Sequence, residues 1–184
     1  MLRLVVLGAH TRILSSVCAD CPHSPAGCCQ APPKMDWSDA GRLTMLGQGA
    51  WLLSEIAAGR LAPSEGGLVL KKAKGVARAE GPKLAKCVYH AADRGCTIDH
   101  DQRPATCNYY VCASVYEADR AEAERAEAAR AALAEAYAAW DAELAARIAS
   151  QWPEGPPWDA AFVAWLGEAF RELAARDEAR LPGG

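Results

Sequence analysis

The sequence predicts an α+β fold that is predominantly helical, with a small cysteine-rich domain covered by a C-terminal helical hairpin. Three observations predict it. All eight cysteines lie in two blocks within the first 112 residues. Residues 115–149 are rich in Ala, Glu and Arg and contain neither Gly nor Pro, which favours a long helix. A Pro-rich breaker then separates two apolar stripes with helical spacing. We therefore expect a cysteine-cluster metal-binding domain at 1–114 and the hairpin at 115–184.

The cysteine spacing predicts a metal site. Thiolate is a soft ligand for zinc, copper(I) and iron–sulfur clusters, and a C-x2-C turn brings two sulfurs to one metal. A disulfide between adjacent residues would be strained, so the neighbouring pair in the first block also favours ligation. Eight thiolates could make two four-sulfur sites or one larger cluster, and both zinc and iron accept such ligands. The candidate ligands are Cys18, Cys21, Cys28, Cys29, Cys87, Cys96, Cys107 and Cys112.

The second block also carries a resemblance to a known family. The pattern C-x2-C…CC, followed by C…C-x-I…RP-x-x-C-x-x-Y-x-C, resembles the YkgJ-type cysteine-cluster family over residues 18–112. The resemblance implies a domain that chelates zinc or iron, or one that contains an iron–sulfur cluster such as 4Fe-4S. Six residues separate Cys21 from Cys28, where the family usually has two or three. The matching positions are Cys96, Ile98, Arg103, Pro104, Cys107, Tyr110 and Cys112.

The apolar runs and the cysteines also predict the cellular compartment. No apolar run approaches the roughly 18–20 residues that a membrane span needs. The apolar run at Leu4–Leu7 is too short for a secretory signal, so we expect a cytoplasmic protein without a membrane segment. Cytoplasmic thiols stay reduced, which favours metal ligands over disulfides. A disulfide framework is the alternative for a secreted chain.

The first half of the chain reads as short elements. We expect a short buried strand at 2–7 and a loop at 15–34 that metal would order. A helix should begin at Asp36 or Ser38 as N-cap and end near Ala58. Its glycines at 41, 47 and 49 weaken it, so it can divide into two short helices. Gly59 fits the position after a helix, Leu68–Leu70 fits a strand, and Trp37 and Trp51 fit core packing.

The second half should be the hairpin of helices at 115–149 and 159–178, with Asp159 capping the second. The early half of the first helix lacks large apolar residues, so residues 115–132 are expected to project into solvent or to meet a protein partner. The apolar stripes predict that the helices bury Tyr137, Trp140, Leu144, Phe162, Leu166 and Phe170 against each other.

Two other features leave alternatives open. The run 71–86 is basic, and it could meet an anionic partner such as RNA, offset thiolate charge, or form a solvated hairpin face. It has no interleaved aromatic residues, so nucleic acid is not favoured. Asp99, His100 and Asp101 could transfer protons beside a metal, or could cap turns. Arg103 is expected to hydrogen-bond across the two blocks.

Three function classes follow. The first is a structural or delivery protein that chelates zinc or iron. The second is a metal- or iron–sulfur-dependent enzyme with its site near Asp99–Asp101, since some flagellin lysine methylases carry a similar cysteine block. The third is a zinc module that binds RNA through 71–86. The chain has no P-loop, no dinucleotide-binding glycine motif, no H-E-x-x-H and no G-x-S-x-G.

Overall fold

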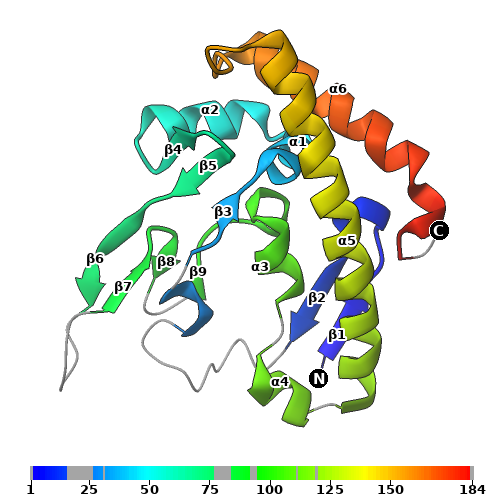
Figure 1. Ribbon diagram of the computed structural model, residues 1–184. Coiled ribbons are helices and arrows are strands. Elements are labelled where there is room, and N and C mark those ends of the chain that lie inside the picture. Colours follow the sequence, from blue (N-terminus) through cyan, green and yellow to red (C-terminus); the bar gives the residue numbers. More distant parts are fainter. Residues whose placement is uncertain are drawn as a thin grey trace.

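A computed structural model describes residues 2–15, 27–30, 32–76, 84–91, 95–110, 112–118 and 120–182. Helix α1 (Trp37–Met45) lies at the centre of the helical part, between the long helix α5 (Arg120–Gln151) and α6 (Ala160–Arg176) (Figure 1). α1 contacts each of these helices more extensively than they contact each other. Asp141 of α5 accepts the Trp37 backbone N–H at 2.8 Å, which fixes the start of α1 against α5.

The largest core, which we call the helical core, forms where these three helices meet. The predicted burial of the α5 and α6 stripes is confirmed, because all six named side chains are buried in this cluster. Trp37 is also buried there, as predicted. Trp140 contacts Phe170 edge-on, with ring centroids 5.3 Å apart. The main difference from the prediction is that α1 from the cysteine-bearing half lies between the two helices.

The capping and turn residues explain where the helices begin and end. Asp36 caps α1, because its carboxylate accepts the Asp39 N–H at 2.8 Å. The predicted division into two short helices is confirmed, since α2 (Gly49–Ala57) follows α1 after a turn. Gly59 follows α2 with φ +68°, a conformation that favours glycine. Asp159 caps α6 by accepting the Phe162 N–H at 2.8 Å.

Two glycines allow α1 and α6 to cross closely. A Cβ added to Gly41 would lie 2.7 Å from the Phe170 Cβ. A Cβ added to Gly167 of α6 would lie 3.1 Å from the backbone nitrogen of Met45. The glycines that lower the helix propensity of α1 thus include one that the packing requires.

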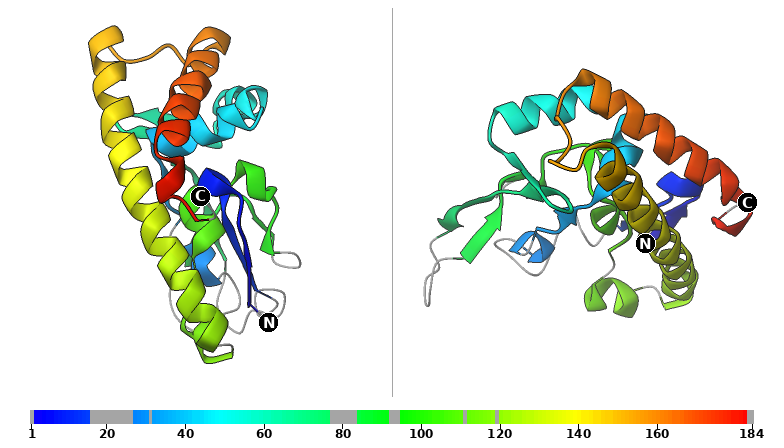
Figure 2. Two further views of the ribbon diagram at one scale, coloured as in Figure 1. Left: turned by 90° about the vertical axis from the view of Figure 1, so that its right-hand side faces the viewer. Right: turned by 45° about the horizontal axis from the view of Figure 1, so that its top comes forward.

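The strands form small antiparallel sheets, of which the β1-β2 hairpin lies along α5 and the others lie below α1 and α2 in the view of Figure 1 (Figures 1 and 2). β5 is the middle strand of the largest described sheet, with order β3-β5-β4. The other described pairs are β1-β2, β6-β7 and β8-β9. The bounds are β1 Leu2–Val5, β2 Arg12–Ser15, β3 Lys34–Met35, β4 Leu61–Ser64, β5 Gly67–Leu70, β6 Lys72–Val76, β7 Leu84–Cys87, β8 His90–Ala91 and β9 Gly95–Cys96.

Short helical segments connect these strands and complete the chain. They are η1 Gly8–His10, η3 Gly27–Gln30, η4 His100–Gln102, α3 Ala105–Tyr109, α4 Ala113–Ala118 and η5 Glu178–Arg180. The strand predicted at Leu68–Leu70 is confirmed as part of β5. The two ends of the basic run form the antiparallel strands β6 and β7. Its middle, 77–83, lies outside the described residues.

A second core, which we call the sheet core, lies between the sheets and α1–α2. It buries Leu43 and Leu52 of the helices against Leu61 and Leu68 of the sheet. Trp51 packs against it from its edge, as predicted. Cys87, and more peripherally Cys29 and Cys96, belong to the same cluster. Part of the cysteine frame is therefore built into a hydrophobic core.

The first half of α5 does not project into solvent, which corrects the expectation for this segment. Ala123 and Ala126 are fully buried against Leu2 and Ile13 of the β1-β2 hairpin. The small alanine side chains let the hairpin approach the helix, so no large apolar residue is needed there. The strand predicted at 2–7 is confirmed only as β1, and Val6 and Leu7 beyond it are 45% and 47% exposed. A protein partner for the outer face of 115–132 stays a prediction.

A mixed α+β fold with small sheets and long C-terminal helices is confirmed. The helical core draws residues from both sides of the predicted boundary between 114 and 115. Among the described residues, no helix is both long and apolar enough to cross a membrane.

Candidate metal centre

Residues of both cysteine blocks come together beside the sheet core. Cys28 and Cys29 lie in η3, which contacts β7, and Cys87 ends that strand. Cys96 lies in β9 and Cys107 in α3. The charges of Cys96 and Cys28 help to raise the pKa of both Cys87 and Cys107. Cys18 and Cys21 lie outside the described residues.

Cys28 and Cys29 behave as one pair that gives up its first proton readily. A hydrogen bond between the two side chains lowers the pKa of Cys28 and raises that of Cys29. The nearby Cys96 and Cys87 raise the pKa of Cys29 further. A metal cation can replace the shared proton, because thiolate, not thiol, is the ligand.

Two thiols of the second block, Cys87 and Cys107, have a raised pKa, which favours their neutral form while no cation is near. Burial raises the pKa of Cys87, and the charges of Cys96 and Cys28 add to this effect. Desolvation by the surrounding protein raises the pKa of Cys107 to about 12, although part of the residue reaches the surface. Each further thiolate is therefore costly without a cation to balance it.

Cys112 lies elsewhere in the structure. It packs against the small cluster of Leu2, Ile13 and Val115, beside the first half of α5. Its role as a ligand stays a prediction that the resemblance supports.

The described thiols do not form a complete ligand set by themselves. Among the residues that the structure describes, no group of three or more His, Cys, Asp or Glu side chains is arranged to hold a metal ion. The neighbouring thiols thus affect the pKa of Cys87 and Cys107, while ligation of a common metal stays a prediction.

Arg103, in the RPATC segment, connects the blocks through its charge. Its Nε donates to the carbonyl of Ile98 at 3.0 Å, so this hydrogen bond stays within the second block. The predicted hydrogen bond across the two blocks is not among the contacts of the described residues. The guanidinium charge nevertheless lowers the pKa of Cys28 in the first block.

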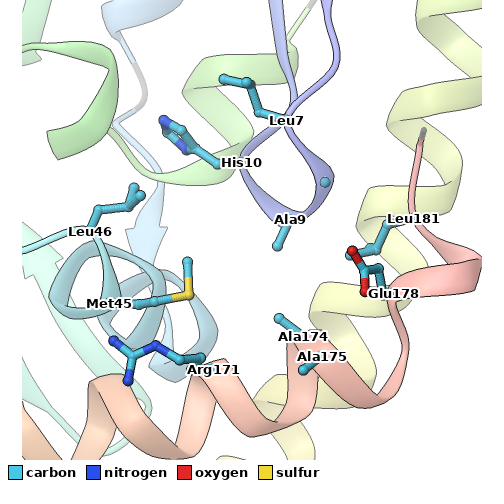
Figure 3. A pocket seen from close by; sticks show the side chains of 11 residues that line it. Leu7, Ala9, His10, Met45, Leu46, Arg171, Ala174, Ala175, Glu178 and Leu181 are labelled. Atoms are coloured by element: carbon cyan, nitrogen blue, oxygen red, sulfur yellow. The ribbon is translucent and has the colours of Figure 1, made fainter. Parts of the chain in front are cut away.

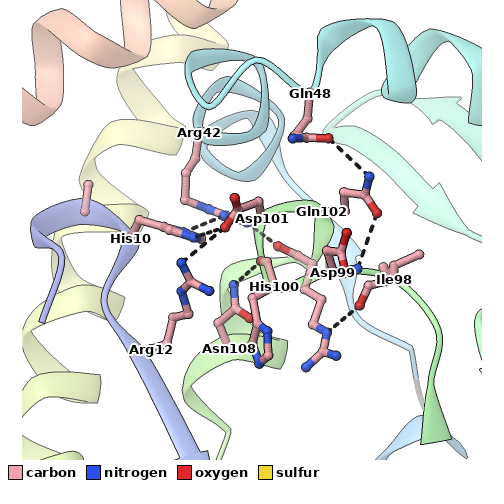
Figure 4. A network of polar contacts seen from close by, with 12 residues as sticks. His10, Arg12, Arg42, Gln48, Ile98, Asp99, His100, Asp101, Gln102 and Asn108 are labelled. Atoms are coloured by element: carbon pink, nitrogen blue, oxygen red, sulfur yellow. Dashed lines mark hydrogen bonds and ion pairs between the residues drawn. The ribbon is translucent and has the colours of Figure 1, made fainter. Parts of the chain in front are cut away.

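A buried polar network holds the loop that carries Arg103 (Figure 4). His10 of η1 contacts Asp101 of η4 through Nε2, at 2.7 Å. Its Nδ1 lies 2.9 Å from Nη1 of Arg42, which leaves Nδ1 as the acceptor because a guanidinium only donates. Arg42 also donates to the Arg103 carbonyl through Nη2. The N-terminal hairpin, α1 and the cysteine loop are therefore linked.

Asp39 and Arg42 form the buried part of this network, one helical turn apart on α1. Asp39 accepts the backbone N–H of Ala105 at 2.6 Å and lies 3.7 Å from Arg42. Burial raises the pKa of Asp39 to about 7, the charge of Asp36 adds to this, and Arg42 opposes it. Sequence reasoning placed Asp39 only at a helix start and assigned no role to His10 or Arg42. The available signal was an Asp–Arg pair at i,i+3 between apolar helix positions.

The two carboxylates considered as catalytic groups have structural partners. Asp101 binds His10 and also lies 3.3 Å from Arg12 Nη2. Asp99 occupies the N-cap position of η4, where its backbone N–H donates to the Gln102 side chain at 3.3 Å. Burial and the charges of Arg103 and Arg12 lower the pKa of His100. These contacts give the Asp101 carboxylate structural partners and place Asp99 at the start of η4.

A shallow depression of about 390 Å³ lies on the other side of His10, between η1, the end of α1 and the end of α6 (Figure 3). Its lining is mostly apolar and includes Leu7, Met45, Leu46 and Leu181. Both ring nitrogens of His10 are already engaged by Asp101 and Arg42. The depression therefore offers no free imidazole nitrogen for chemistry.

Comparison of the chain with family models, with curated proteins and with solved structures gave no match in any of the three.

Proposed function

We propose that this protein binds zinc or iron, the latter alone or in an iron–sulfur cluster, through thiolates of its two cysteine blocks. The observation that carries the proposal is that the adjacent pair Cys28–Cys29 of η3 lies against β7, which ends at Cys87, and that Cys29, Cys87 and Cys96 share the sheet core although they lie far apart in the sequence. A small cysteine-rich unit, covered by the helices, would hold the metal.

The chemistry of the donor set fits a soft or borderline cation. The acidic member of the Cys28–Cys29 pair supplies a first thiolate, and a bound cation would lower the pKa values that burial raises at Cys87 and Cys107. Four thiolates around Zn²⁺ leave a net negative charge, which Arg103 would partly offset. The protein class that fits best is a structural or delivery protein, since the Asp101 carboxylate already has structural partners.

The test is anaerobic purification followed by metal analysis and an absorption spectrum. An iron–sulfur protein would be brown, with thiolate-to-iron absorption, whereas a zinc protein would be colourless. Cys96→Ser should lose most of the bound metal, because Cys96 acts electrostatically on both blocks. Cys112→Ser is the matched comparison. Loss of metal in this variant would identify Cys112 as a ligand, and full retention would identify it as a packing residue. A reduced wild-type protein that binds neither zinc nor iron would refute the proposal.

A further inference from the structure

We propose that Asp39 and Arg42 of α1 are positioning residues for the cysteine site, which hold the loop from Asp99 to Cys107 ready for ligation. This inference rests on the proposed metal binding. It assigns part of the site to α1 and to the N-terminal hairpin, which contain no cysteine among the described residues.

The first support is the pair of contacts that α1 makes with the backbone of RPATC. Asp39 accepts the Ala105 N–H at 2.6 Å, two residues before Cys107. Arg42 donates to the carbonyl of Arg103, on the other side of Pro104. Two backbone groups that flank a proline are thus held by one turn of one helix, which fixes the direction of the chain into Cys107.

The second support is that the same network also holds the start of this loop. His10 accepts a hydrogen bond from Arg42 at Nδ1 and contacts Asp101 through Nε2. Arg12 of the hairpin adds a contact to the same carboxylate at 3.3 Å. The loop is therefore held at Asp101, Arg103 and Ala105 by groups of α1 and of the N-terminal hairpin. Figure 4 shows His10 and Arg12 beside Asp101.

The third support is burial and rigidity. Asp39 and Arg42 are 4% and 1% exposed, and α1 is held closely against α6 at Gly41. Buried groups that hydrogen-bond to a loop backbone restrict its motion more than exposed ones, because water does not compete for them. Groups of this kind, just outside a metal's ligands, commonly orient the ligands and tune affinity.

The test compares two changes at one position. Asp39→Asn keeps an oxygen that accepts the Ala105 N–H, whereas Asp39→Ala removes it and leaves a buried donor unpaired. Affinity for Zn²⁺ is measured by competition with a chromophoric chelator, and the Co²⁺-substituted proteins are compared by absorption. We expect Asp39→Ala to weaken Zn²⁺ binding by about 10–100-fold and to alter the Co²⁺ spectrum, and Asp39→Asn to stay near wild type.

Two further variants keep the test decisive. Leu144→Ala lowers stability in the helical core but removes no hydrogen bond to the backbone of RPATC, so it should leave the Zn²⁺ affinity unchanged. Arg42→Lys keeps a charge beside Asp39 but cannot contact both His10 and Arg103, so it should also weaken Zn²⁺ binding. It provides the test if Asp39→Ala does not fold. Wild-type Zn²⁺ affinity and an unchanged Co²⁺ spectrum in folded Asp39→Ala or Arg42→Lys would overturn the inference. Absence of metal binding by the wild type would instead refute the proposed function.

Discussion

His10 shows how a single residue can join distant parts of this chain. Both ring nitrogens are engaged, one by Arg42 and one by Asp101, and the ring is 7% exposed. With Arg42 as donor, Nδ1 must accept, so the folded protein requires neutral imidazole at this position. Burial and the charges of Arg42 and Arg12 lower the pKa of His10, although Asp101 opposes the shift.

A pH dependence of stability follows from this lowered pKa. Between the folded pKa and the ordinary value of 6.5, the unfolded chain binds more protons at His10 than the folded one. The free energy of unfolding should therefore fall as the pH falls below 6.5, and this contribution should be constant at higher pH. Asp39, with its pKa raised to about 7, acts in the opposite direction over part of the same range.

The measurement isolates His10 by comparison. Urea unfolding of the metal-free protein, followed by helical circular dichroism, is measured at about pH 7.5 and about pH 5.5 for wild type and His10→Gln. The wild type should lose more stability on acidification than His10→Gln, because only the wild type must keep a buried imidazole neutral. Equal losses in the two proteins would mean that His10 is free to take up a proton in the folded state.

At the scale of elements, the contact between α1 and α6 depends on the absence of a side chain at Gly41. Alanine is a better helix former than glycine by about 1 kcal/mol, so propensity alone predicts that Gly41→Ala would stabilise α1. The new Cβ would lie 2.7 Å from the Phe170 Cβ, which is close to its own helix backbone and cannot move aside easily. We expect a net loss of about 1–3 kcal/mol in the free energy of unfolding, measured by urea denaturation.

Gly66→Ala provides the matched control for Gly41→Ala. A Cβ at Gly66 meets no heavy atom within 4 Å, so this change should leave stability nearly unaltered. An increase in stability for Gly41→Ala would show that α6 can move away from α1 without cost.

Trp140 tests the packing of α5 on the same core. Its side chain is fully buried, contacts Tyr137 and Phe170, and donates from Nε1 to Asp177 at 2.9 Å. Trp140→Ala should cost about 3–5 kcal/mol, because it removes the transfer energy of the indole and leaves a cavity. Thermal unfolding checks this result, and full retention of the melting temperature would place the stripe outside the stabilising core.

Local patterns predicted the main helices and the strands at β1 and β5, but not the other strands or the neighbours of each element. The stripes of α5 and α6 repeat at helical spacing, and Asp36 and Asp159 are common capping residues, so these features can be read from the chain. The central position of α1 depends on a contact between Gly41 and Phe170, far apart in the sequence, and no local pattern encodes it. The buried Asp39 and Arg42 were missed because such residues are usually exposed.

At the scale of the whole molecule, the clustering of the cysteines predicted that the two blocks would meet. It did not predict the polar network that holds the cysteine loop. Cys28 and Cys29 do lie near Cys87, because η3 contacts β7. The network from His10 through Arg42 joins residues with no shared motif, so only the three-dimensional structure reveals it. The packing of Cys112 beside the N-terminal hairpin likewise depends on tertiary contacts.

The two large cores should respond differently to metal removal, and this difference gives a prediction for the whole molecule. The helical core contains no cysteine, whereas the sheet core includes Cys29, Cys87 and Cys96. If metal joins these thiols, chelation should loosen the cysteine segments 15–34 and 87–112 and leave α5 and α6 folded, since most of their packing is with α1 and with each other.

Limited proteolysis of the protein before and after verified metal removal tests this difference. Trypsin should then cleave faster at Lys86, directly before Cys87, while cleavage at Arg147 within α5 stays slow. Hydrogen exchange in the same samples should show increased exchange at 87–112 and unchanged protection in α5 and α6. Equal protease resistance of both regions after metal loss would mean that the sheet core holds the cysteine segments without metal. Loss of protection in α5 and α6 as well would mean that the two cores unfold as one unit, because α1 contributes residues to both.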